Sequence, residues 1–166
     1  MPVSLLSSLP LPLDTPIITL RITGPRRHAL AETLQCTLVT PSAQLLDEEI
    51  TYASVPAWDG LIGIAPMRAP LLIKLGDGPL RLDFTQGGSR WFFVGGGFAQ
   101  MLGNHLSLLT SEAVPGGDIV LRDAEDALQE ASGLEAISDE ELLRKNRRVA
   151  RARAMVGLAQ RLGHRI

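Results

Sequence analysis

The stretch Pro115-Gly116-Gly117 separates two parts of the sequence that predict different secondary structure, and no other stretch does so. Before this point, from about Leu34 onward, short alternating segments and tight turns predict β-strands. After it, the sequence predicts two helices of opposite charge. Few ordinary enzymes combine a complete β module with a helical hairpin. The hairpin is therefore either a structural appendage or a moving part.

Three segments before Pro115 have apolar residues at every second position: 34–38, 50–53 and 80–84. This period is typical of strands with one buried face, so Ile50 and Tyr52 are expected on the same side. Turns are predicted between strands at Gly76-Asp77-Gly78, Gln86-Gly87-Gly88 and Gly103-Asn104. Regular short strands of this kind predict an all-β sandwich or flattened barrel.

The run Gly95-Gly96-Gly97 has two interpretations. A phosphate-binding loop would need a helix after the glycines. Instead, Phe98 to Leu102 again looks like a strand. We therefore expect a bend or bulge where two backbones pass closely, rather than a nucleotide site.

The two predicted helices differ in charge. Residues 118–135 contain six acidic residues and one basic residue, whereas residues 139–166 contain eight basic and three acidic residues. Ser132-Gly133 is a plausible end for the first helix. Ser138 and Glu141 form a capping box that starts the second. A short connection and opposite charge predict an antiparallel hairpin.

The seam of this hairpin is predicted to consist mostly of small side chains. The first helix would contribute Ala124, Ala127, Leu128 and Ala131, and the second Leu142, Val149, Ala152, Val156 and Ala159. Apolar burial stabilises by roughly 25 cal/mol per Å², and exposed ion pairs add only about 0–1 kcal/mol each. We therefore expect a weakly held hairpin. A partner could then shift the equilibrium between its docked and detached states.

The domain organisation follows from these segments. We expect a β-sandwich over residues 34–117 and a regulatory hairpin over residues 118–166. Residues 1–33 are expected to be a disordered tail or a non-native extension upstream of the true start. The alternative for this segment is a signal peptide, because Ala29-Leu30-Ala31 is similar to a cleavage site, although a positively charged start is missing.

The composition restricts the function. Hydrophobic residues make up 45% and charged residues 20% of the chain, so a packed core is expected. A formal net charge of -2 and a basic helix without interleaved aromatics argue against nucleic-acid binding. A single Cys36 excludes an internal disulfide. No apolar run approaches the ~20 residues that cross a bilayer, so any link to a membrane would run through a partner.

We expect no catalytic, cofactor-binding or metal-binding residues. His28, His105 and His164 are far apart and share no ligand spacing. The sequence has neither a Gly-x-Ser-x-Gly elbow nor a GKS/T phosphate loop. These observations favour a binding or mechanical protein. One interpretation is a free-standing β-sandwich adaptor whose ligand is a peptide or a glycan.

Four stretches of the β half carry a resemblance to a known family. Residues 59–72, Asp-Gly-Leu-Ile-Gly-Ile-Ala-Pro-Met-Arg-Ala-Pro-Leu-Leu, resemble the G-x-x-G-x-x-P-x-H-A-P-L pattern of epsilon subunits of F-type ATP synthases. Residues 36–41 are similar to that family's first strand, and 91–98 to its aromatic strand with a following S-G-G-hydrophobic run. Residues 106–113 resemble its V-T-V-L-A-D-x-A strand. The resemblance extends in order from Leu34 to about residue 162, mainly as architecture in the helices.

This resemblance implies a sandwich of about ten strands followed by a helical hairpin, in a non-catalytic rotor subunit. The sandwich would bind the gamma subunit and the membrane c-ring, coupling proton or sodium flow to ATP synthesis. The hairpin would extend along gamma and contact the beta subunits, inhibiting ATP hydrolysis. The resemblance further implies a peripheral position at the cytoplasmic face of the bacterial cell membrane, and no homo-oligomer.

Candidate contacts with the c-ring or gamma are Asp59, Leu61 and Arg68. The sequence departs from the family here, because Met67 and Arg68 stand where Gly and His are usual. The family often has an acidic residue near Leu61, and Asp59 is the nearest carboxylate in this chain. These departures change the expected details of the c-ring contact.

Candidate contacts with an acidic segment of the beta subunits are Arg144, Arg147, Arg148 and Arg151. Some family members bind ATP on the hairpin through an I/L-D-x-x-R-A pattern, which aligns with residues 122–127. Asp126 stands at the position of the arginine and would repel phosphate. We therefore expect weak or absent ATP sensing.

Overall fold

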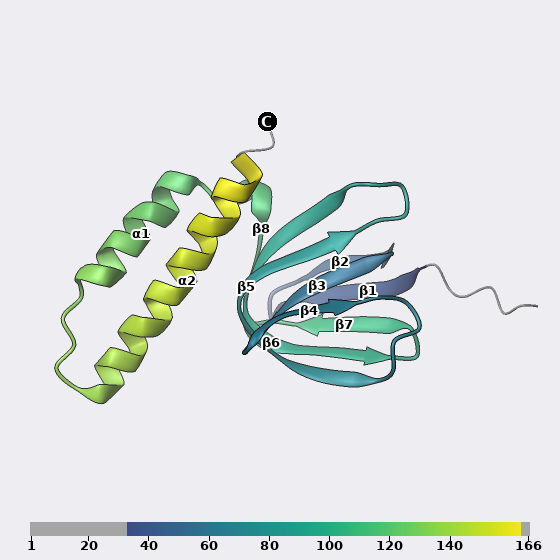
Figure 1. Ribbon diagram of the computed structural model, residues 1–166, viewed down its shortest axis with the longest axis horizontal. Coiled ribbons are helices and arrows are strands. Elements are labelled where there is room, and N and C mark those ends of the chain that lie inside the picture. Colours follow the sequence, from purple (N-terminus) through teal and green to yellow (C-terminus); the bar gives the residue numbers. More distant parts are fainter. Residues whose placement is uncertain (1–32, 164–166) are drawn as a thin grey trace, which may run out of the picture.

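The computed structural model describes residues 33–163. The expectations for residues 1–32, including Ala29-Leu30-Ala31, and for His28 and His164 lie outside this range. A β-sandwich is followed by two helices that stand beside one end of it (Figure 1). This arrangement confirms the predicted fold class.

The sandwich contains eight strands in the part of the chain described. They are β1 (Leu34–Val39), β2 (Gln44–Ile50), β3 (Tyr52–Ala57), β4 (Gly60–Ile64), β5 (Leu71–Asp83), β6 (Ser89–Leu102), β7 (His105–Leu109) and β8 (Ala113–Pro115). Their spatial order is β2-β1-β7-β6-β5-β3-β4, with β8 paired to β6. Only the β1–β7 pair is parallel among these strands.

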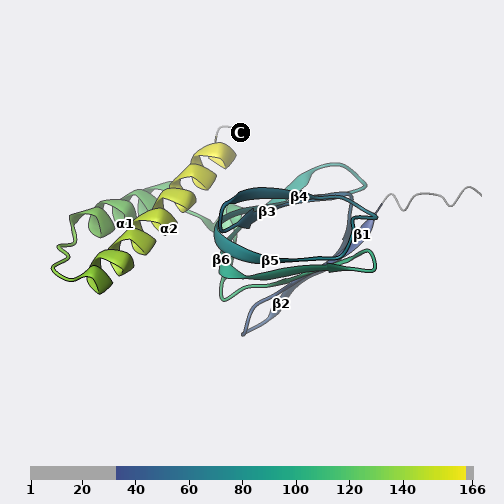
Figure 2. The ribbon, with the colours of Figure 1, turned by 60° about the horizontal axis from the view of Figure 1, so that its bottom comes forward.

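The two longest strands belong to both layers of the sandwich. The structure therefore has eight strands, where the family resemblance implied about ten. β5 and β6 curve from one layer into the other (Figure 2). Near Phe98, β6 pairs with β7, whereas near Phe93 it pairs with β8. The predicted turn at Gly76-Asp77-Gly78 is wrong, because β5 is continuous there and pairs with β6 both before it, at Leu75↔Gly97, and after it, from Asp77↔Gly95. These glycines bend the strand instead of reversing it.

The bend predicted at Gly95-Gly96-Gly97 is confirmed. Gly96 and Gly97 have φ angles of +63° and +113°, which L side chains rarely adopt. A Cβ on Gly97 would overlap the carbonyl oxygen of Leu109 and lie 2.8 Å from Cα of Thr110. Close approach of two backbones therefore explains the glycine at position 97.

The core lies between the two layers and is built mainly from leucine, isoleucine, valine and alanine. Alternate residues of β1 and of residues 80–83 are buried, as their sequence pattern predicts. The expectation that Ile50 and Tyr52 share a face is wrong: Ile50 is buried and Tyr52 is exposed. The chain bends at Thr51 between β2 and β3, so the alternation restarts there.

A short 3-10 helix, η1 (Gly116–Asp118), leads from the sandwich into α1 (Leu121–Gly133) and α2 (Asp139–Gly163). The two helices pack antiparallel (Figure 1). The capping box is confirmed: the amide of Glu141 donates to the Ser138 hydroxyl, and the Glu141 carboxylate accepts from the amide of Ser138. Hydrogen bonds from the amides of Ile137 and Ser138 lower the pKa of Glu141.

The hairpin seam matches the prediction in part. Ala124, Ala131, Ala152 and Ala159 are buried, whereas Ala127 and Leu142 are exposed. Leu142 is exposed because the first turns of α2 extend past the end of α1 (Figure 1). The seam is therefore made chiefly of alanine side chains, which bury little apolar area.

Candidate partner-binding surfaces

The loop residues predicted to contact the c-ring or gamma flank β4. Asp59 precedes this strand, Leu61 lies near its start, and Arg68 follows it; all three are exposed. The guanidinium of Arg68 folds back and donates to the carbonyl of Gly63 at 2.9 Å. Asp59 and Arg68 therefore lie at opposite ends of a five-residue strand and do not form one charged cluster.

The conformation of this loop is set at Met67. Its φ is +61°, unusual for a residue with a side chain, and its amide donates to the Asn104 side chain at 2.9 Å. Asn104 also donates to the carbonyl of Thr33 at 2.7 Å, so it joins the loop to the start of β1. The side chain of Met67 is exposed.

An apolar surface on the outside of the sandwich was not found by sequence reasoning. Leu72 on β5, Phe98 and Leu102 on β6, and Leu109 on β7 are between 52% and 69% exposed. Their strands are adjacent, and Phe98 pairs directly with Leu109. We call these four residues the outer apolar face. Alternation of apolar and polar residues does not reveal this face, because residues 98–102 include apolar side chains on both sides of the strand.

The basic residues predicted to contact the beta subunits lie on α2 and divide into two groups. Arg144, Arg147 and Arg148 are exposed, and the only ion pair recorded among them joins Arg144 to Glu140 of the same helix at 3.5 Å. Among residues 33–163 no salt bridge links α1 to α2, although the helices have opposite charges. Instead, Lys145 of α2 donates to the carbonyl of Leu134, directly after α1, at 2.6 Å and so links α2 to the loop between the helices.

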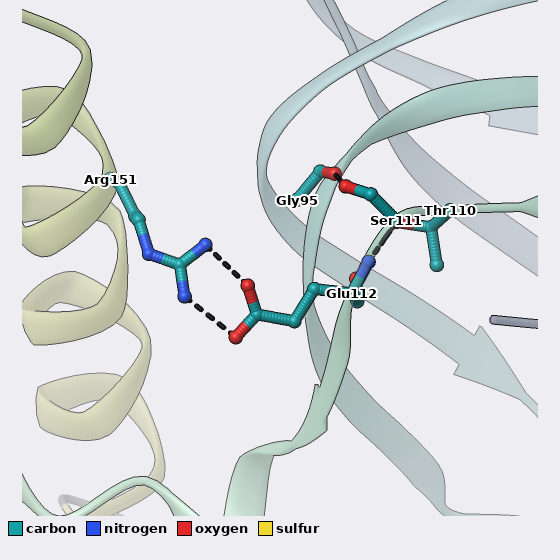
Figure 3. A network of polar contacts seen from close by, with 5 residues as sticks. All are labelled: Gly95, Thr110, Ser111, Glu112 and Arg151. Carbon is teal, nitrogen blue, oxygen red and sulfur yellow. Dashed lines mark hydrogen bonds and ion pairs between the residues drawn. The ribbon is translucent and has the colours of Figure 1, made fainter. Parts of the chain in front are cut away.

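Arg151 differs from the other three, because it faces the sandwich (Figure 3). Two of its nitrogens each lie 2.6 Å from a carboxylate oxygen of Glu112, and its guanidinium lies 4.9 Å from the centre of the Phe93 ring. Hydrogen bonding to Glu112 is the main cause that raises the pKa of Arg151. We call Glu112 and Arg151 the docking pair. The sequence gives no sign of it, because the two residues are 39 positions apart.

Cys36 and His105 are two further chemistry-bearing residues of the described range. Cys36 is buried, and burial raises the pKa of its thiol to about 12, which suits a small core residue. His105 contacts the hydroxyl of Thr37 at 3.0 Å. Within the described range, no group of three or more His, Cys, Asp or Glu residues is placed to hold a metal ion. None of the helices in that range is both long and apolar enough to span a membrane.

Comparisons with known proteins agree with this arrangement. Residues 33–116 match the family model described as ATP synthase, Delta/Epsilon chain, beta-sandwich domain. An ATP synthase epsilon chain from Rhodopirellula baltica is 35% identical over 74% of this chain and 95% of its own length. The chain belongs to the ATP synthase epsilon-chain family. Because that relative is covered almost completely, the family relationship extends beyond the sandwich into the hairpin.

Solved structures show the same fold at low sequence identity. A chain in the OSCP/F1/c-ring structure of Euglena gracilis mitochondrial ATP synthase has a TM-score of 0.72 and 18% identity, covering 80% of this chain and 84% of its own length. A chain in the central stalk/c-ring structure of Tetrahymena thermophila mitochondrial ATP synthase has a TM-score of 0.62 and 16% identity, covering 75% and 95% respectively. The same fold therefore occurs in both assemblies at low sequence identity.

A second contact holds the hairpin to the sandwich, where the end of α2 meets η1. Leu162 lies over Gly116, and Arg161 lies 5.3 Å from the centre of the Trp91 ring. A Cβ on Gly116 would lie 2.6 Å from Cδ1 of Leu162 and 3.0 Å from the carbonyl oxygen of Trp91. At Gly116 itself the end of the helix and the sandwich leave no room for a side chain.

Replacing Gly116 with Ala should therefore weaken docking of the hairpin. The new methyl group must displace Leu162 and also crowds the backbone carbonyl of Trp91, and such overpacking costs typically about 1–3 kcal/mol. Limited proteolysis should cleave the Gly116→Ala chain between sandwich and helices several times faster than the unaltered chain. Gly117→Ala is the matched control, because a Cβ at Gly117 would meet nothing within 4 Å. Equal cleavage rates for both variants would show that this contact does not hold the helices.

Proposed function

We propose that this chain is a non-catalytic central-stalk subunit of a bacterial F-type ATP synthase. In this role it couples ion flow through the membrane c-ring to ATP synthesis. The observation that carries the proposal is the family match, which covers nearly the whole length of an epsilon chain. The chains of similar fold come from an OSCP/F1/c-ring assembly and from a central stalk/c-ring assembly, which supports the same placement.

The outer apolar face supports a permanent partner for the sandwich. Four large apolar side chains on three neighbouring strands form the kind of exposed patch that marks an interaction surface. We assign this face to the gamma subunit. The loops around β4, with Asp59, Leu61 and Arg68, are assigned to the c-ring and the adjoining part of gamma. Leu61 and Met67 are both exposed, so apolar contact contributes to this second surface.

In this role the chain lies at the cytoplasmic face of the bacterial cell membrane, held there through its partners. Copy number follows from the same role, since one rotor needs one such subunit and no homo-oligomer. An affinity-tagged chain should co-purify from membranes with the gamma, beta and c subunits, and its gene should lie beside that of a catalytic ATPase subunit. Recovery of the tagged chain without these subunits would instead support the free-standing adaptor.

The exposed arginines of α2 support an additional inhibitory role. Arg144, Arg147 and Arg148 present three guanidinium groups to solvent on one side of the helix. In the inhibitory state, the hairpin extends and these groups meet an acidic segment of the beta subunits. Asp126 on the exposed surface of α1 disfavours phosphate binding, so this switch is expected to respond weakly or not at all to ATP.

Replacing Arg144, Arg147 and Arg148 together with Ala should raise ATP hydrolysis by the assembled enzyme. Each exposed ion pair contributes about 0.3–1 kcal/mol, so three lost contacts weaken the inhibitory state by about 1–3 kcal/mol, a factor of about 5 to 150. Steady-state hydrolysis by the purified complex measures this directly. Arg153→Ala is the control, because Arg153 is also exposed on α2 but lies outside this group. Hydrolysis that is unchanged in the triple variant would mean that these arginines are only solvated.

A further inference from the structure

We propose that Glu112 holds the hairpin against the sandwich by competing with the partner surface for Arg151. The structural part of this inference stands on the docking pair alone, whereas its consequence for hydrolysis rests on the proposed function. Four arginines of α2 occupy positions i, i+3, i+4 and i+7, which places them on one side of the helix. We call Arg144, Arg147, Arg148 and Arg151 the arginine stripe. In the docked state only the last of them is bound to the sandwich.

Glu112 is well placed to act as an anchor because its backbone is held firmly. Its carbonyl accepts hydrogen bonds from the amide of Gly95 at 2.9 Å and from the hydroxyl of Thr110 at 2.8 Å. The neighbouring Ser111 hydroxyl donates to the carbonyl of Gly95 (Figure 3). The Glu112 carboxylate is thus presented by the rigid sandwich. Detachment of the hairpin therefore breaks its contact with Arg151.

The surroundings of Arg151 make this contact specific to one arginine. Its guanidinium lies beside the Phe93 ring and above Gly95, where a Cβ would lie 3.3 Å from its nearest nitrogen. Phe93 is fully buried but lies outside the apolar cluster between the two layers, so its ring faces the hairpin. A planar guanidinium can bond a carboxylate through two nitrogens while stacking on an aromatic face, and a lysine cannot do both. The docking pair therefore depends on the planar shape of the guanidinium as well as on its charge.

The other charges near this contact favour competition. Lys74 and Asp77 of β5 line the same hollow as Arg147, Arg148 and Arg151. Asp77 also helps to raise the pKa of Arg151, but its effect is smaller than that of Glu112. A partner rich in carboxylates can use all four guanidinium groups of the arginine stripe only after Arg151 has left Glu112. Docking to the sandwich and full engagement of the partner therefore exclude each other.

Glu112→Gln in the isolated full-length chain tests the structural part. Ala159 is buried and lines the groove between α2 and the sandwich, so in an Ala159→Cys background the introduced thiol reacts with a maleimide when the hairpin detaches. Cys36 lies in the sandwich core, and its labelling reports global unfolding in the same sample. Loss of a charge-assisted, two-nitrogen contact should raise labelling at position 159 by about five- to thirtyfold, with no change at Cys36.

Glu140→Gln is the matched control, because it removes the same charge from a carboxylate whose arginine partner lies on its own helix. The exchange Glu112→Arg with Arg151→Glu should restore slow labelling only in part, because it recreates the ion pair but leaves no guanidinium over the Phe93 ring. Labelling at position 159 that is no faster in Glu112→Gln than in Glu140→Gln would overturn the proposal.

Hydrolysis by the assembled enzyme tests the consequence. Release of Arg151 should populate the inhibitory state, so Glu112→Gln should lower ATP hydrolysis. Glu48→Gln, which removes the same charge from an ion pair with Arg90 inside the sandwich, should not. Faster labelling together with lower hydrolysis supports both the docking pair and the inhibitory role. Faster labelling with unchanged hydrolysis supports the docking pair and argues against inhibition by the hairpin.

Discussion

Gly97→Ala should lower the free energy of unfolding by about 3 kcal/mol or more. A backbone φ of +113° is strained for any L side chain, at a cost of about 1–3 kcal/mol. The added methyl group would also overlap the Leu109 carbonyl and the backbone of Thr110, and overpacking adds about 1–3 kcal/mol. Backbone atoms of paired strands cannot move aside as a flexible side chain can. Relief would require breaking the pairing of β6 with β7 beside Phe98 and Leu109.

Urea unfolding, followed by far-UV circular dichroism, measures this effect. The midpoint should fall while the slope of free energy against urea concentration stays the same, since the surface exposed on unfolding is unchanged. Gly103→Ala is the control. Gly103 also has a positive φ, +56°, but a Cβ there would meet nothing within 4 Å. Only the backbone strain of about 1–2 kcal/mol then applies. Equal losses at both positions would show that the close approach of the two backbones is not what requires glycine at position 97.

Gly97 also illustrates how far glycine patterns predict a fold. Three consecutive glycines followed by another strand indicated a bend and not a phosphate loop, and the bend is present. The same reasoning failed at Gly76-Asp77-Gly78, where β5 continues. Glycines at a reversal and glycines at a bend have the same local composition. Whether the chain reverses depends on pairing with β6, which is a contact between residues about 20 positions apart.

The period of two identified buried faces wherever the opposite side of a strand is polar. Leu34, Cys36 and Leu38 were placed correctly in this way. It could not reveal the outer apolar face, since Phe98 and Leu102 are followed or preceded by apolar core residues on the same strand. Such a strand looks buried on both sides. Only the structure shows that one side is exposed to solvent.

Helical spacing had the same limit at the arginine stripe. It correctly indicates that Arg144, Arg147, Arg148 and Arg151 lie on one side of α2. It gives no reason to separate Arg151 from the others, because its partner Glu112 is on the sandwich. The opposite net charges of the two helices also did not indicate how the hairpin is held. Alanine packing joins the two helices to each other, and the ion pair that α2 makes outside its own helix is with Glu112 of the sandwich. The position of the hairpin is therefore a tertiary property.

Leu72→Asp combined with Phe98→Asp is expected to prevent the chain from assembling into the ATP synthase complex. Both side chains belong to the outer apolar face, which we assign to gamma. Each aspartate would lose its hydration in the interface without gaining a positive charge or a hydrogen-bond donor, at a cost of about 2 kcal/mol or more. Two such losses correspond to a fall in affinity of about a thousandfold. Co-purification of the tagged chain with the complex from membranes should drop to background.

The isolated double variant should still fold, because both side chains point to solvent. Its melting temperature should change by only a few degrees, since the strand propensity of a solvent-facing residue varies by about 1 kcal/mol. Leu143→Asp is the matched control: Leu143 and Leu72 are both 69% exposed, but Leu143 lies on the hairpin. The Leu143 variant should co-purify normally, because the sandwich alone is expected to hold the chain in the complex. Full recovery of the double variant with gamma would place the stalk contact elsewhere on the sandwich, and loss of both variants would mean that the hairpin is also needed for assembly.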